Sequence, residues 1–230
     1  MSKVYADAIT TTEASQDLTL GGSGDNVIVT AGATLKTNTV KDSGGNTLWT
    51  SDGSGTLSSV NAAMKGNMTL LSTQTASNAA NVSFTSSIDS TYKLYNFKFI
   101  DINPATASAY FQWQGSTDGG SSYGVTWTTT YSWTAHAEDN TPTQEMGYAA
   151  AYDEAQNTNY QKLHDTLRND ADACLAGELW LFAPSSTTYV KHWYARCNAM
   201  FNYSNVGSGE AYTAGYFNTT SAIDAAQFKM

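Results

Sequence analysis

The sequence has few cysteines, prolines and charged residues, and it contains no long apolar run. Of its 230 residues, 2 are Cys, 3 are Pro and 13% are Asp, Glu, Lys or Arg. No segment approaches the roughly 18 apolar residues of a membrane span, and residues 1–20 lack the apolar core of a secretion signal. We therefore expect a chain that is made in the cytoplasm without a signal peptide and is not inserted in a membrane.

Basic residues are scarcer than acidic ones. The chain has 11 Lys and Arg against 20 Asp and Glu, which gives a net charge of -9. Proteins that hold phosphate backbones or anionic lipid surfaces do so through clustered Lys and Arg side chains. The composition therefore predicts neither a nucleic-acid partner nor binding to an acidic membrane surface.

Cysteine and histidine are too few and too scattered for a metal centre. His136, His164 and His192 have no i,i+4 pairing, and no CxxC or mixed Cys/His spacing suits zinc. Cys174 and Cys197 each lie in an apolar, strand-like stretch. We interpret them as reduced thiols in the core, and a disulfide between neighbouring strands stays open as the alternative. We expect no metal and no cofactor.

Motifs of catalysis are also missing. The sequence has no GxSxG nucleophile elbow. The glycine-rich stretch at 21–24 lacks the strand, turn and helix that convert a glycine loop into a phosphate site. We therefore assign no catalytic residue and expect a protein that is not an enzyme.

Carboxylates are dense between Glu138 and Glu178. A pair of them at roughly 5–9.5 Å would suit glycoside hydrolysis, and oxygen ligands would suit calcium, although Asp-x-Asp at 170–172 lacks the rest of an EF-hand loop. We favour a third interpretation, a solvated rim of the fold. The nine carboxylates are Glu138, Asp139, Glu145, Asp153, Glu154, Asp165, Asp170, Asp172 and Glu178.

The N-terminal part of the chain is a series of short apolar clusters separated by glycine-rich turns. After a polar leader at 1–16, such turns stand at 21–26, 42–46 and 51–55. The clusters hold too few apolar residues to bury a core of their own. We therefore predict a short-stranded stem over 17–66 that packs against other copies of itself.

Residues 67–230 predict a β-sandwich head. The composition changes around 61–68, and the strand patterns beyond it are longer and alternate clearly between apolar and polar residues. Two facing sheets would bury the apolar sides, so we predict an all-β, antiparallel, jelly-roll-like sandwich. The predicted strands are 68–75, 81–85, 92–102, 108–114, 125–134, 177–183, 190–201, 211–218 and 223–230.

Alternation also predicts which side chains face the core. Over 125–134, one face carries Trp127, Tyr131 and Trp133 and the other carries only Ser and Thr. The remaining inward residues are Val125 and Thr129 on this strand, Tyr95, Phe97 and Phe99, Ala109, Phe111 and Trp113, and Trp193, Ala195, Cys197, Ala199 and Phe201.

The region 152–172 lacks this alternation. Tyr160, Leu163 and Leu167 recur at intervals of three and four, as in a short amphipathic helix. Asn and Asp crowd both ends and favour turns, so we predict a long connection containing one turn of helix.

Aromatic side chains give the sequence's candidates for ligand recognition. Stripes of Trp, Tyr and Phe on a sheet can bind sugar rings, but we assign Trp127, Tyr131 and Trp133 to the core, since a sandwich needs a buried face. Tyr123 lies at the edge of the 118–122 loop, and loops on rigid scaffolds often carry binding residues. It is therefore the candidate for surface recognition.

Several long segments resemble structural proteins of tailed bacteriophages, particularly phages of marine bacteria and cyanobacteria. Segment 33–61, ATLKTNTVKDSGGNTLWTSDGSGTLSSVN, resembles their slender, glycine-punctuated stem. A recurring head domain of the same virion proteins is similar to TSSIDSTYKLYNFKFIDINPATASAYFQWQGSTDGGSSY at 85–123, LWLFAPSSTTYVKHWYARCNAMFNY at 179–203 and AGYFNTTSAIDAAQFKM at 214–230. In such proteins the segment that corresponds to 222–230 is usually followed by a turn and another strand.

The resemblance implies a non-enzymatic component of the virion, most typically a tail fibre or tail-associated protein. Its partners would be other copies of itself, for which we expect a trimer, and other virion proteins. Capsid decoration, or a head fibre, is the alternative. A module that recognises a host surface glycan is the second alternative. No catalytic residue or cofactor is carried over.

Overall fold

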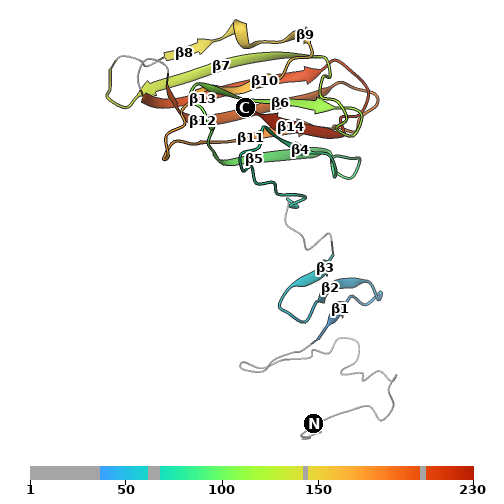
Figure 1. The fold of residues 1–230 in the computed structure, drawn as a ribbon. Helices are drawn as coiled ribbons and strands as arrows, with labels where there is room; N and C mark the ends of the chain where they lie inside the picture. Colours follow the sequence, from blue (N-terminus) through green and yellow to red (C-terminus); the bar gives the residue numbers. More distant parts are fainter. Residues whose placement is uncertain (1–36, 62–67, 142–144, 203–205) are drawn as a thin grey trace, which may run out of the picture. The chain divides into compact units, whose positions relative to one another are not determined.

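The computed structural model describes residues 37–61, 68–141, 145–202 and 206–230. The chain divides into two compact units, Met1–Thr69 and Leu70–Met230. In both units the strands pair antiparallel (Figure 1). Within the described ranges, no helix is long and apolar enough to cross a membrane. The predicted leader and the first part of the predicted stem lie outside the described residues.

The smaller unit contains a three-stranded sheet with the order β1-β2-β3. Its strands are β1 (Thr39–Lys41), β2 (Thr47–Ser51) and β3 (Leu57–Val60). Asp42 and Asp52 each close one of the two connecting turns, because each carboxylate accepts two backbone N–H groups of its own turn. These are two of the glycine-rich turns that the sequence predicts.

The larger unit contains one continuous 11-stranded sheet, which bends at the β10–β12 pairing into two facing sheets. One has the order β5-β11-β12-β13-β7-β8, with β9 also paired to β7, and the other has the order β4-β14-β6-β10. The bounds are β4 (Asn81–Phe84), β5 (Leu94–Ile102), β6 (Ala109–Ser116), β7 (Trp127–Ala137), β8 (Glu145–Tyr148), η2 (Ala150–Tyr152), β9 (Ala155–Asn157), β10 (Gln161–Leu167), β11 (Leu175–Phe182), β12 (Lys191–Asn202), β13 (Val206–Phe217) and β14 (Ala225–Lys229).

The strand order is that of a jelly roll in which a three-stranded meander, β11-β12-β13, occupies the place of one strand. The sheets meet at β10, where Leu167 pairs with both Ala109 of β6 and Phe201 of β12. Two register shifts interrupt β10, and Thr166 has a φ of 48°. Such bulges bend a strand, which lets β10 pass from one sheet to the other. The predicted antiparallel β-sandwich is confirmed.

Aromatic rings from the two sheets interlock in the core. Trp113 of β6 lies 4.8 Å from Trp193 of β12, measured between ring centroids, and Phe99 of β5 lies 5.1 Å from Phe228 of β14. The ring of Trp127 is tilted against that of Trp193 at 5.6 Å and stacks on that of Phe217 at 5.2 Å. The inward faces predicted by alternation on β5, β6, β7 and β12 are confirmed, since their members are buried or half-buried.

Two predictions of secondary structure were wrong. The structure describes residues 68–75 and shows no strand there, although the sequence pattern predicts one. Residues 161–167 form β10, with Leu163 and Leu167 fully buried, where the sequence suggested a connection or a helix. The bulged register of β10 places Leu163 and His164 both in the interior, so the strand lacks the strict period of two.

The prediction of two core thiols is right for one cysteine only. Cys197 points inward from β12, and burial raises the pKa of its thiol to about 12. Cys174 is exposed, because it stands one position before Leu175, the first inward-facing residue of β11. Both thiols are free.

Candidate functional site

Four of the carboxylates between Glu138 and Glu178 make contacts with different groups of the protein. Asp153 accepts a hydrogen bond from the backbone N–H of Tyr131 at 2.7 Å, and Asp165 accepts one from the Tyr131 hydroxyl at 3.2 Å. Asp170 pairs with Arg168, and Glu178 pairs with Lys98 on a different strand. Among the described residues, no group of three or more His, Cys, Asp or Glu is arranged to hold a metal ion.

Tyr123, the sequence's candidate for surface recognition, is half-buried against its own loop. Its hydroxyl oxygen is buried and has no hydrogen-bond partner in the described part of the chain. A Cβ atom on Gly120 would come within 2.7 Å of that oxygen. The loop backbone therefore packs closely over the hydroxyl.

Asp118 organises the same loop. Its carboxylate accepts hydrogen bonds from the hydroxyls of Ser116 and Ser122, both at 2.6 Å, and from the backbone N–H of Ser122 at 2.9 Å. These bonds favour the ionised form, so they lower the pKa of Asp118 to about 2.

Replacing Asp118 by Asn should make the larger unit less sensitive to acid. The folded-state pKa of about 2 lies below the ordinary value of 3.8, so the carboxylate's contribution to stability is complete above that value and is lost as the pH falls towards 2. In urea titrations, the gap between wild type and Asp118→Asn should be widest near neutral pH and should close under acid. Asp101→Asn, at an exposed carboxylate, should follow the wild type. A gap that is constant with pH would contradict this role.

The outer face of the larger sheet carries a set of aromatic side chains that sequence reasoning missed. They alternate with inward-facing residues along three neighbouring strands, β11, β12 and β13. Phe182 is 36% exposed, Tyr194 is 45% exposed and Tyr212 is 40% exposed. The full set is Trp180 and Phe182 of β11, His192 and Tyr194 of β12, and Tyr212 and Tyr216 of β13. We call this set the outer aromatic face.

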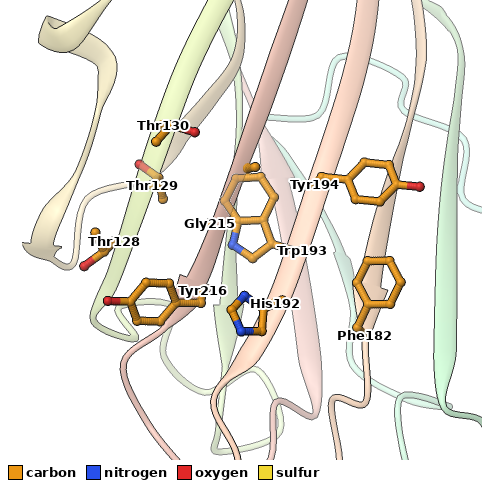
Figure 2. A pocket seen from close by; sticks show the side chains of 10 residues that line it. Thr128, Thr129, Thr130, Phe182, His192, Trp193, Tyr194, Gly215 and Tyr216 are labelled. Carbon is orange, nitrogen blue, oxygen red and sulfur yellow. The ribbon is translucent and has the colours of Figure 1, made fainter.

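A shallow depression of about 340 Å³ lies in the outer aromatic face. Strand register fixes its floor: Ala214 of β13 lies between Tyr194 of β12 and Thr130 of β7. In the next row, Tyr216 lies between His192 and Thr128. Figure 2 shows these two rows side by side, with aromatic rings on β11, β12 and β13 and threonines on β7. The small side chain of Ala214 leaves the space open.

The rings around the depression contact one another. The ring centroids of Phe182 and Tyr194 are 5.7 Å apart, those of His192 and Tyr216 are also 5.7 Å apart, and Trp180 stacks on Tyr194 at 6.4 Å. Such contacts contribute about 0.5–1.5 kcal/mol each beyond burial. The rings are therefore held in place on a rigid sheet, and part of their surface is left to solvent.

Charged side chains beside the depression are paired. Lys98 pairs with Glu178, and Arg196 pairs with Glu210. The Lys98 ammonium is the main cause of the lowered pKa of Glu178, and the Arg196 guanidinium has the same effect on Glu210. Neither pair lines the depression, whose lining is neutral or aromatic.

An apolar row crosses the three-stranded sheet of the smaller unit. Val40 pairs with Trp49, and Trp49 pairs with Val60, so the three side chains lie side by side on one face. All three remain partly exposed. Over 37–57, 60 and 61, where side-chain exposure is described, no residue is buried. The described part of this unit therefore has no core.

We compared the chain with models of protein families, with curated proteins and with solved structures, and none of the three comparisons gave a match.

Proposed function

We propose that the chain is a non-enzymatic structural component of a tailed-bacteriophage particle that assembles with its own copies through residues 17–66. The observation that carries this proposal is the apolar row Val40, Trp49 and Val60, which lies on a sheet without a core. A three-stranded sheet needs a packed apolar face to be stable. Sister chains would provide that packing in the particle.

A second exposed apolar segment supports assembly. Residues 68–76 have no secondary structure and every one of them is exposed. Leu70 is 82% exposed and Met68 is 65% exposed. Monomeric soluble proteins seldom leave neighbouring large apolar side chains in solvent without a partner. A second copy, packed on this segment, would cover them.

Among positions on the particle, we favour a tail fibre or a tail-associated trimer, because the stem resembles that of such proteins. Capsid decoration is the alternative. Immunogold labelling of particles that contain the chain separates the two: label confined to the tail supports a fibre, and label that follows the symmetry of the shell supports decoration.

Replacing Trp49 by Ser should weaken self-association at least about tenfold, because it removes the largest apolar side chain of the row. Sedimentation velocity over a dilution series would measure the change. Tyr189→Ser removes an exposed aromatic residue from the larger unit and should leave association as in the wild type. Equal association constants for Trp49→Ser and wild type would count against assembly through this row.

A further inference from the structure

We propose that the depression in the outer aromatic face is a binding site for a neutral saccharide, in which one sugar ring stacks on Tyr194 above Ala214. This inference goes beyond assembly, since it concerns the Leu70–Met230 unit alone and does not depend on the stem. It also places recognition on a different surface from Tyr123, which does not line the depression.

The first argument is the combination of ring faces and hydroxyls. A sugar ring presents C–H groups on its faces, which pack on aromatic rings, and hydroxyls at its rim, which need hydrogen-bond partners. Tyr194 and Phe182 provide the aromatic surface on one side of Ala214. On the other side, Thr130 is exposed on β7. The two kinds of group therefore face the same space, as a sugar requires.

Individual polar groups at the depression have bonding capacity left for a ligand. The Thr128 oxygen accepts a hydrogen bond from the Asn218 amide at 3.3 Å, so its own hydrogen remains to be donated. His192 is exposed, and in the described part of the chain its ring nitrogens make no hydrogen bond with protein. Each imidazole nitrogen can serve as donor or acceptor according to its tautomer.

Charge favours a neutral ligand. The lining contains no Lys, Arg, Asp or Glu. In the next outward-facing row of the sheet, Lys98 and Arg196 are each paired with a glutamate, and the chain has a net charge of -9. An acidic saccharide would meet no unpaired cation in the lining and would be repelled by the overall charge. A neutral sugar needs no cation and is not repelled by the negative charge of the chain.

The shape favours a small ligand over a large protein surface. The volume of about 340 Å³ is at the low end of the roughly 300–1,000 Å³ of small-molecule sites. The depression is shallow and open along the sheet, so a chain of sugars could continue past it. Stacking leaves the second face of the ring in water, which suits such an open site.

Binding should be measured by saturation-transfer difference NMR on the full chain. The probes are neutral tri- and tetrasaccharides of glucose, galactose, mannose and N-acetylglucosamine, with a polygalacturonate oligomer as the acidic comparison. We expect at least one neutral probe to bind with a Kd of about 1 mM or tighter. No binding by any neutral probe, or preferential binding of the acidic one, would overturn the proposal.

Three variants test the location. Ala214→Phe fills the depression from an outward-facing position, and it should weaken binding at least about tenfold. Tyr194→Ala removes the stacking surface and should weaken binding by a similar factor. Tyr189→Ala, which removes an exposed ring outside the depression, should bind within about twofold of wild type. Binding that survives both Ala214→Phe and Tyr194→Ala would overturn the site.

Two further readouts separate the outcomes. Melting temperatures close to that of wild type would show that Ala214→Phe and Tyr194→Ala remain folded. The sedimentation of Ala214→Phe tests a different occupant, a second copy of the chain: a lower association constant would assign the face to self-assembly and overturn the saccharide. Trp49→Ser should bind the probe as wild type does, so failure of stem assembly and failure of this site are distinguishable.

Discussion

Replacing Trp113 by Ala should lower the free energy of unfolding of the Leu70–Met230 unit by about 3–5 kcal/mol. Trp113 is fully buried between the two sheets, and its ring contacts those of Trp127, Trp193 and Phe217. Truncation would leave a cavity that both sheets line, because rings held by strands on either side cannot collapse into it. Urea unfolding followed by far-UV circular dichroism would measure the loss.

A second substitution at the same position provides the control. The indole nitrogen of Trp113 is buried and has no hydrogen-bond partner in the described part of the chain. Trp113→Phe keeps most of the apolar contact and removes this unpaired N–H, so it should cost much less than Trp113→Ala. Tyr189→Ala should change stability by about 0.5 kcal/mol or less. Similar losses for Trp113→Ala and Tyr189→Ala would contradict the described core.

Replacing Lys191 by Met should lower the free energy of unfolding by about 2–4 kcal/mol, because it removes one charged donor that serves three carbonyl oxygens at once. Lys191 is completely buried at the start of β12. Its ammonium donates to the carbonyl oxygens of Ser186, Tyr189 and Thr219 at 2.9–3.3 Å and so joins two loops at one end of the sandwich. Met keeps the apolar stem of the side chain, so the loss reports on the ammonium.

The direction of the Lys191 pKa agrees with this environment. Burial lowers it from the ordinary value, since the charged form loses hydration that three carbonyls only partly replace. Lys93→Met is the matched control, because Lys93 is exposed, and it should leave the urea midpoint nearly unchanged. If Lys191→Met and Lys93→Met unfold at the same urea concentration, the three hydrogen bonds contribute nothing to stability.

The sandwich could be predicted from sequence because its longest strands alternate without interruption. Trp127, Thr129 and Tyr131 share one face in the pattern and are buried together in β7. The same argument fails for β10, where a bulge interrupts the alternation and the neighbouring strands β6 and β12 supply the backbone partners. Such pairings are tertiary, and no local pattern in 152–172 records them.

The candidate site was missed for a different reason. The alternation that places Leu179, Leu181 and Trp193 in the core also places Trp180, Phe182 and Tyr194 on the opposite face. The alternation pattern therefore shows that these rings point outward, but a pattern within one strand does not show that the rings of different strands come together. Their meeting depends on the register between β11 and β12, which the structure supplies.

Light scattering on the full chain at about 10 µM tests most directly whether the smaller unit requires partners. Our account predicts a mass above that of one chain, and for the expected trimer about 74 kDa, three times 24.6 kDa. A single species of 24.6 kDa at this concentration would contradict it. The apolar row of Val40, Trp49 and Val60 would then stand in solvent without a sister chain, and assembly would no longer explain it.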